Sequence, residues 1–590
     1  MKIFAFLKKD LWGKGIRARG RVNTRCWIGL GNPGRHTGLT ALFLLVLVCL
    51  GCGDYYRPVA IPIPVNSPNP AALHFMYSVA SAGALNAGSI SQIDVTGDAL
   101  TAVVDSGQSP VHATSSPDGS RLYVANSGDD TVTVSSNSAQ PTIINLAQIC
   151  PQTNPCPLVP VFVHSTESGK MYVADKGTGT ISVINTAPNA VVATVAVNPA
   201  FAGSPLPSPN PAAQPVALAE MPNGTKIYSV NQGDSTVTSI NTIDDSVATR
   251  IPFSSPPIWA VASSDSAYIY VLDKNGFISV IDTLSDTVVS TASAGAGANY
   301  IFYDRQSNRL YVTNQTQSNV VVLDASGNTL VAHTPIPISA SASSACSTAA
   351  LSAGAPVPPA LPTSITVLGD ESRAYVASYQ LYTASGVTSV CTQADVIDNG
   401  TRRVTKTIPL FQAADNSSQT GCSAARFRVF IAASGGGANT PFKVFVSQCD
   451  AGSIGDIYTA ASTTGPPTDQ HPADVLMAAL PAPVSSTSSG QISVSDVSLA
   501  NFTTTYTFSP MTPTNLQAGS IVVITGLQNV VIGGVTYSPN GLFAISSVTG
   551  NTFTVSSPNK LGTQTGSESG QTGNGTVLAV GNPVFLVPGP

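Results

Sequence analysis

The sequence predicts an all-β protein: a β-propeller of eight, alternatively seven, four-stranded blades, followed by a small C-terminal β-sandwich or barrel. A tetrapeptide resembling Tyr-Val-Ala-Asn recurs along the chain, and many copies are followed by a second apolar run that ends in Ile-Asp or Ile-Asn. A period of roughly 40 to 70 residues built only from short strands is typical of one propeller blade per repeat. The eight tetrapeptides are Tyr77–Ala80, Tyr123–Asn126, Tyr172–Asp175, Tyr228–Asn231, Tyr270–Asp273, Tyr311–Asn314, Tyr375–Ser378 and Phe445–Gln448.

These tetrapeptides resemble the repeat of the YVTN-type bacterial β-propellers, which are relatives of the lactonase-like propellers. The resemblance extends from residue 74 to about residue 480. It implies the propeller fold, and it implies export because many members of the family are secreted or surface-exposed. It implies no catalytic residue, since no combination of acidic and histidine side chains here matches a lactonase, and a fold alone does not define an activity.

Residues 1–52 are expected to form a signal peptide. Nine Lys and Arg residues precede His36, against the single acidic residue Asp10, and the apolar run Leu39–Leu50 follows them. This run has the length of a signal-peptide core and is too short to span a bilayer comfortably. Gly51-Cys52 resembles the lipobox of bacterial lipoproteins, which implies that Cys52 becomes the lipidated N-terminus. Ordinary signal cleavage and a retained anchor are the alternatives.

A proline-rich tether at 53–73 would hold the propeller, predicted at 74–485, away from a membrane. The first repeat lacks an innermost strand, and we expect Asp474–Leu480 to supply it and close the ring. A different pattern of alternating strands at 490–590 predicts the small accessory domain.

Six cysteines follow Cys52, and an even number in an exported protein favours disulfide bonds. Cys150 and Cys156 bracket a short loop between two blades, so we expect them to bond to each other. No cysteine pair has the spacing of a zinc site, and we expect no metal and no other cofactor. Sequence alone leaves open the partners of the remaining four, Cys346, Cys391, Cys422 and Cys449.

Aligning the repeats by their tyrosines reveals a second repeating position. A proline, or Ala298 in the sixth repeat, precedes each expected innermost strand, and larger side chains often stand two residues later. Because innermost strands border the channel of a propeller, this ring is a candidate ligand site. The alternative is that these side chains pack between blades. The candidate ligand-binding residues are His112, Phe162, Trp259, Tyr300 and Ser364.

The favoured functional hypothesis is an exported, lipid-anchored protein of the bacterial cell envelope that binds a protein, a glycan or a small ligand. Charged residues make up only 10% of the chain, and no basic footprint for nucleic acid is present. No nucleophile elbow, phosphate loop or zinc-protease motif is present, so no catalytic residue is assigned and an enzyme is not favoured. The alternative is a lactonase-type hydrolase acting at the channel. A quinone-dependent dehydrogenase is disfavoured because Trp259 is the only tryptophan within the repeats.

Overall fold

A computed structural model describes residues 75–589 with gaps, and almost all of the described chain is β-structure. Among these residues one helix is present, α2 (Ala345–Ser352). The chain divides into Met1–Ile63 and Pro64–Pro590, and the described residues belong to the second unit. The gaps are 83–85, 97, 137–138, 147–156, 199–211, 416–420, 435–441, 464–469, 499–502, 510–520, 526–529, 533–534, 538–540, 551 and 557–571.

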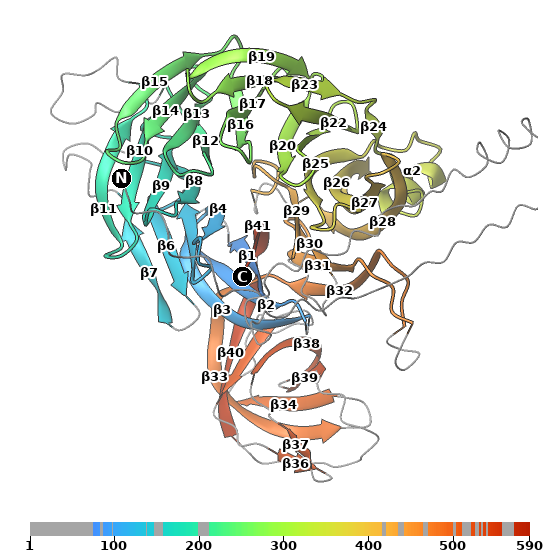
Figure 1. Ribbon diagram of the computed structural model, residues 1–590. Helices are drawn as coiled ribbons and strands as arrows, with labels where there is room; N and C mark the ends of the chain where they lie inside the picture. Colours follow the sequence, from blue (N-terminus) through green and yellow to red (C-terminus); the bar gives the residue numbers. More distant parts are fainter. Residues whose placement is uncertain are drawn as a thin grey trace, which may run out of the picture. The chain divides into compact units, whose positions relative to one another are not determined.

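Eight antiparallel sheets surround a common axis, which confirms an eight-bladed propeller (Figure 1). From the innermost strand outward, blades 1 to 3 are β41 (Asn582–Pro588), β1 (Phe75–Ser81), β2 (Ala87–Asp94) and β3 (Ala99–Gln108); β4 (Pro110–Ser115), β5 (Arg121–Asn126), β6 (Thr131–Ser136) and β7 (Ala139–Asn145); β8 (Pro160–Ser165), β9 (Lys170–Asp175), β10 (Thr180–Asn185) and β11 (Ala190–Ala196). Blades 4 and 5 are β12 (Pro215–Glu220), β13 (Lys226–Asn231), β14 (Thr236–Asn241) and β15 (Val247–Pro252); β16 (Pro257–Ala262), β17 (Tyr268–Asp273), β18 (Phe277–Asp282) and β19 (Thr287–Ser293).

The last three blades follow the same order. Blade 6 contains β20 (Ala298–Asp304), β21 (Arg309–Asn314), β22 (Asn319–Ser326) and β23 (Thr329–Ala332), with β24 (Ile336–Pro337) also paired to β22. Blade 7 contains β25 (Leu361–Val367), β26 (Arg373–Ala384), β27 (Val387–Asp398) and β28 (Arg403–Ala414). Blade 8 contains β29 (Val429–Ala433), β30 (Lys443–Gln448), β31 (Ser453–Tyr458) and β32 (Val475–Pro481).

The C-terminal end of the chain closes the ring, but through a different segment from the one that the sequence predicted. Asp474–Leu480 was expected to be the innermost strand of blade 1, and this was wrong, because it falls largely on β32, the outermost strand of blade 8. The closing strand is β41, which pairs with β1 at the register Val79 opposite Phe585. The two segments are similarly apolar, but β32 is partly exposed whereas most of β41 is buried.

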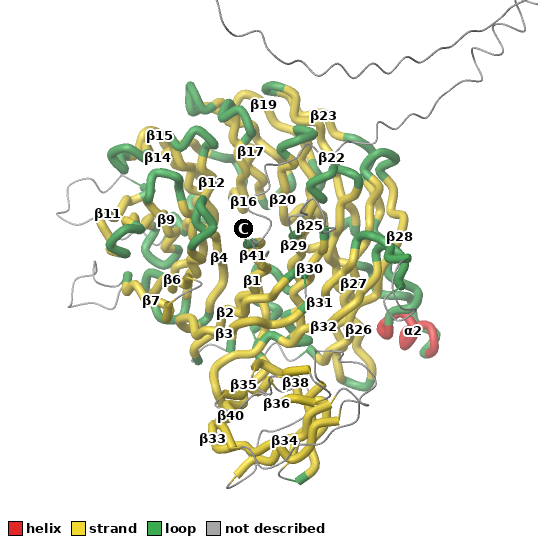
Figure 2. The backbone as a smooth tube through the Cα atoms, turned by 60° about the horizontal axis from the view of Figure 1, so that its bottom comes forward, coloured by secondary structure: helices red, strands yellow, loops and turns green. Residues whose placement is uncertain are grey.

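Between β32 and β41 the chain forms a separate closed barrel, which confirms the small all-β domain. Its range differs from the predicted 490–590 because the first barrel strand begins earlier and the last strand of the chain, β41, lies in the propeller (Figure 2). The barrel order is β33 (Pro483–Ser498), β34 (Thr503–Ser509), β39 (Thr552–Ser556), β38 (Gly541–Thr549), β35 (Ile521–Thr525) and β40 (Thr572–Val580), and β36 (Val530–Ile532) and β37 (Val535–Tyr537) form a hairpin.

The recurrent tyrosines lie between blades. The side chain of Tyr172 is buried, and its hydroxyl donates to a carboxylate oxygen of Asp245 in the next blade at 2.6 Å. Lys170 forms an ion pair with the same carboxylate at 2.9 Å. Asp245 stands in a turn at a φ of 58°, a conformation that Asp tolerates better than most residues. The turn that carries Asp245 therefore links one blade to the next. Asp286 makes the same contacts with Lys226 and Tyr228 of the preceding blade.

A buried polar network repeats at the last residue of the tetrapeptide. In blade 2, the side-chain amide of Asn126 donates to the hydroxyls of Thr131 and Thr133, each at 2.9 Å. In blade 3 the equivalent residue is Asp175, which has no exposed surface and instead accepts hydrogen bonds from Thr180 and Ser182. Burial raises the pKa of Asp175 to about 8, so this carboxyl is largely protonated at neutral pH. Blade 4 has the amide again, at Asn231.

Two disulfide bonds resolve the pairing that the sequence left open, joining Cys346 to Cys391 and Cys422 to Cys449. Disulfide bonds persist in oxidising compartments, so the two bridges indicate a protein that is exported. The predicted bridge between Cys150 and Cys156, and the predicted lipid site at Cys52, lie outside the described residues. Within the described residues, no helix has the length and apolar character needed to cross a membrane.

Candidate functional site: an aromatic ring at the propeller axis

The innermost strands share a local irregularity near their first residues. In seven of the eight blades the pairing with the second strand skips one residue, directly after the starting proline or its equivalent. Proline suits this position because it has no N–H to place in the sheet, and a bulge re-aims the side chains beside it. The residues before the skipped position are Pro110, Pro160, Pro215, Pro257, Ala298, Pro362 and Pro583.

In the seven blades with a skipped position, the next residue lies opposite the third residue of the tetrapeptide, and in blade 8 Phe430 occupies the same register. All five candidate ligand-binding residues lie at this register, together with Ala217 and two phenylalanines from the last and first blades. In blade order the eight residues are Phe585, His112, Phe162, Ala217, Trp259, Tyr300, Ser364 and Phe430.

Six of these side chains contact one another in a closed circuit, which we call the axial ring. Its members are His112, Phe162, Trp259, Tyr300, Phe430 and Phe585. Taken in that order, successive ring centroids lie 3.7, 5.5, 5.2, 6.2 and 4.3 Å apart, and 4.5 Å closes the circuit from the last member to the first. Ala217 and Ser364 share this register but are not members of the axial ring. The rings of Phe162 and Trp259 contact each other across the blade of Ala217, and those of Tyr300 and Phe430 across the blade of Ser364.

Ser364 has a structural contact instead of an axial one. Its hydroxyl is fully buried and accepts a hydrogen bond from the backbone N–H of Ile431 in the next blade, at 3.1 Å. This bond joins β25 to β29. The structure therefore brings four of the five predicted ligand-binding residues together and places the fifth between two blades.

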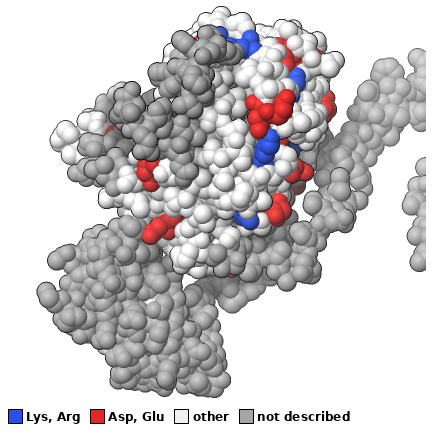
Figure 3. Space-filling model, turned by 90° about the vertical axis from the view of Figure 1, so that its left-hand side faces the viewer, with Lys and Arg blue, Asp and Glu red and all other residues white. Residues whose placement is uncertain are grey.

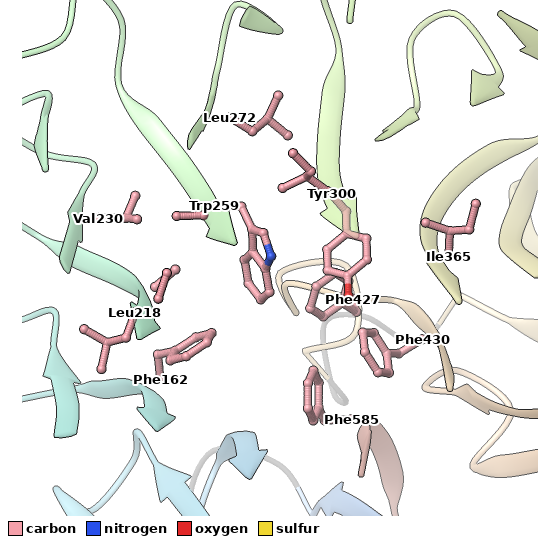
Figure 4. Close-up of a cluster of buried hydrophobic side chains, with 14 of the residues drawn as sticks. Phe162, Leu218, Val230, Trp259, Leu272, Tyr300, Ile365, Phe427, Phe430 and Phe585 are labelled. Atoms are coloured by element: carbon pink, nitrogen blue, oxygen red, sulfur yellow. The ribbon is translucent and has the colours of Figure 1, made fainter. Parts of the chain in front are cut away.

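Phe427 fills the middle of the axial ring (Figure 4). It comes from the connection between β28 and β29, and its ring centroid lies 5.9 Å from that of Trp259, 5.3 Å from Tyr300 and 4.8 Å from Phe430. The exposed fractions of Trp259 and Tyr300 are 7% and 8%. The aromatic side chains of the axial ring are thus buried and pack against one another around the axis.

The polar atoms of the axial ring make few hydrogen bonds within the described residues. Nδ1 of His112 accepts from the backbone N–H of Val163 at 3.4 Å, which leaves the ring proton on Nε2. Burial, aided by the charges of Arg426 and His164, lowers the pKa of His112 to about 3, so the imidazole is neutral at physiological pH. Burial also raises the pKa of Tyr300, which keeps its phenol protonated.

Arg426 lies against the axial ring from the same connection as Phe427. Its guanidinium carbon stands 4.3 Å from the centroid of the Trp259 ring, and Nη2 donates to the backbone carbonyl of Ile258 at 2.7 Å. That carbonyl belongs to the residue skipped in the pairing of β16 with β17. Desolvation by the surrounding protein lowers the pKa of Arg426 to about 10, although the residue is exposed and stays charged.

Arg428, in the same connection, is an arginine with a structural role. Arg428 is buried and forms a bidentate pair with Asp450, at 2.6 and 2.8 Å, and a further ion pair with Asp415 at 2.8 Å. Arg426, by contrast, forms no ion pair with any described residue. The bridge from Cys422 fixes the start of this connection to Cys449, next to the end of β30. Arg426 is therefore held in place but not neutralised.

A second polar pair lies on inner strands at the far end from the proline positions. Nε2 of His164, on β8, is 2.9 Å from a carboxylate oxygen of Glu220, the last residue of β12. The other carboxylate oxygen of Glu220 is buried and has no hydrogen-bond partner among the described residues. The repeat pattern gave no sign of this pair of an acidic and a histidine side chain, because the two residues occupy different repeat positions.

Sequence reasoning also missed Phe430, Phe585, Arg426 and Phe427. A signal was available for Phe585, since Pro583-Val584-Phe585 repeats the pattern of Pro110-Val111-His112. Phe430 was hidden because it lies 15 residues before its reference residue Phe445, whereas His112 lies 11 residues before Tyr123. Nothing in the repeat pattern pointed to Arg426 or Phe427, which belong to a connection and not to a strand.

No protein-family model and no curated protein matches this chain. Similar solved structures include a periplasmic gluconolactonase of Pseudomonas aeruginosa, with 14% identity over 58% of this chain and 99% of that chain, at a TM-score of 0.41. An inactive virginiamycin B lyase from Staphylococcus aureus has 14% identity over 59% and 94%, at 0.38. Hydrazine synthase of Kuenenia stuttgartiensis has 15% identity over 65% and 89%, at 0.38. Likeness at this level concerns the fold and does not transfer an activity.

Proposed function

We propose that the protein is an exported binding protein of the bacterial cell envelope, without catalytic activity, and that its ligand binds where Arg426 meets the axial ring. The observation that carries this proposal is an exposed arginine without a carboxylate partner among the described residues, held against Trp259, one of the four predicted ligand-binding residues of the axial ring. Charged and aromatic groups placed together at a rigid scaffold are characteristic of binding sites. The tetrapeptide repeats support membership of the YVTN-type propellers.

Few other charged side chains are available to bind a ligand. Only 10% of the chain is charged, and Lys, Arg, Asp and Glu are sparse on the described part of the side shown in Figure 3. A partner that recognises a dense basic surface, such as nucleic acid, is not expected on this composition. We expect a protein, a glycan or a small ligand instead.

The test of binding uses the full-length protein on glycan and peptide arrays, with hydrolysis of lactones measured on the same preparation. We expect reproducible binding to at least one class of array ligand and no hydrolysis above background. Hydrolysis that is lost in His112→Ala or His164→Ala would contradict the non-catalytic assignment.

The second candidate is a lactonase-type hydrolase, and His164 with Glu220 is the observation that favours it. A histidine paired with a carboxylate at 2.9 Å is a common arrangement for general acid or base catalysis. It is the weaker candidate because the sequence holds none of the hydrolase motifs considered above. Activity lost in His164→Ala but kept in His112→Ala would place the chemistry at this pair.

Attachment to the membrane is proposed through a lipid on Cys52. The basic leader, the apolar run Leu39–Leu50 and Gly51-Cys52 together support this assignment. In a bacterium that processes lipoproteins, the wild-type chain should incorporate labelled fatty acid and Cys52→Ser should not. Equal labelling of the two chains would refute lipidation at this residue.

A further inference from the structure

Arg426 has hydrogen-bonding capacity that the protein leaves unused. A guanidinium carries five N–H donors, and one of them is engaged, by the carbonyl of Ile258. No carboxylate among the described residues pairs with it. The two stretches outside the described residues that are nearest to Arg426 along the chain, 416–420 and 435–441, contain no Asp or Glu. Because Arg426 is exposed and its charge is not paired within the described residues, its remaining N–H donors are available to a ligand.

The polar groups next to Arg426 are donors as well. Trp259 has an indole N–H, Tyr300 a phenol O–H and His112 an Nε2–H, and none of these three groups has a hydrogen-bond acceptor among the described residues. The positive charge of Arg426 reaches two of them, since it acts on the pKa values of both His112 and Tyr300. The axial ring and Arg426 together therefore offer donor groups and no negative charge.

We propose that Arg426 binds the carboxylate of a small organic acid beside Trp259. A planar guanidinium matches a carboxylate with two parallel hydrogen bonds, and this pair is stronger and more selective than a neutral hydrogen bond. One arginine balances one carboxylate, which makes a singly charged acid the best fit. The inference rests on the proposed binding function and specifies its ligand chemistry. An aromatic acid and a sugar acid both carry this group, and the experiment distinguishes them.

The test exploits the small number of tryptophans. The chain has three, so Trp12→Phe with Trp27→Phe in the full-length protein leaves Trp259 as the sole reporter, in direct contact with Arg426. Benzoate and glucuronate are titrated at constant ionic strength, with benzamide and glucose as neutral counterparts. We expect a saturable change in Trp259 fluorescence with at least one of the two acids and none with the neutral counterparts.

In the same background, Arg426→Gln should weaken the response to that acid by at least about tenfold, because it removes the charge and the paired donors. Arg426→Lys should restore part of the affinity, since it returns the charge without the planar fork. Arg305→Ala, an exposed arginine in the turn between β20 and β21, should bind as the parent protein does. Thermal unfolding of each variant verifies that it is folded.

Equal affinity in Arg426→Gln and the parent protein would overturn the proposal. So would the absence of a response to both acids while the array ligand still binds, and that result would leave the proposed binding function standing. Failure of binding on the arrays, with a carboxylate response that depends on Arg426, would instead uphold the carboxylate site and restrict the function to small acids.

Discussion

Replacing Phe585 by Ala is expected to lower the free energy of unfolding by about 3 to 5 kcal/mol, the cost of deleting a well-packed aromatic side chain. Phe585 is buried, and its ring centroid lies 4.3 Å from that of Phe430 and 4.5 Å from that of His112. It also sits on β41, the strand that joins the end of the chain to blade 1. Loss of this side chain would thus leave a cavity and would also weaken the closure of the propeller by β41.

Denaturant unfolding of the full-length protein, followed by circular dichroism, measures this effect. Pro588→Ala is the matched control, because Pro588 is an exposed residue of the same strand and should change stability by less than about 0.5 kcal/mol. Coincident unfolding curves for Phe585→Ala and the wild type would show that β41 does not close the propeller.

The second large effect is expected from Asp175→Asn. The pKa of Asp175 is raised from 3.8 to about 8 in the folded protein, so the folded state binds a proton that the unfolded state releases. This carboxyl supports folding fully below pH 3.8, and its contribution is lost as the pH rises through about 8. Asparagine carries no charge and can make the hydrogen bonds that Asn126 makes in blade 2.

We therefore expect Asp175→Asn to raise the free energy of unfolding at pH 8 by at least about 2 kcal/mol, and to have much less effect near pH 4. Unfolding midpoints of both proteins across this range measure the difference. The reciprocal change Asn126→Asp should create the same pH dependence in blade 2. Parallel stability profiles for wild type and Asp175→Asn would mean that this carboxyl is not held protonated.

Much of the fold could be predicted because each blade repeats its own local signals. A tyrosine begins seven of the eight tetrapeptides, and a buried Asn or Asp ends five of them. The identity of the closing strand could not be predicted from composition, because β32 and β41 are both short apolar strands. Pairing between the two ends of a chain is a contact of very long range, and only the motif at Pro583, which was overlooked, could have identified the right partner.

The candidate site was predictable in part for the same reason. His112, Phe162, Trp259 and Tyr300 share one register, and equivalent positions in a propeller converge on its axis. Arg426 could not be found this way. A connection has no repeat to align, and its position depends on the bridge between Cys422 and Cys449 and on packing at the axis.

The location of the binding site is the central claim, and hydrogen exchange of the full-length protein with and without the array ligand tests it most directly. We expect the ligand to slow exchange in residues 421–430 and at the first residues of β4, β8, β16 and β20, where the axial ring and Arg426 lie. Protection confined to the C-terminal barrel, between Pro483 and Val580, with exchange around Arg426 unchanged, would contradict a binding site at the axis.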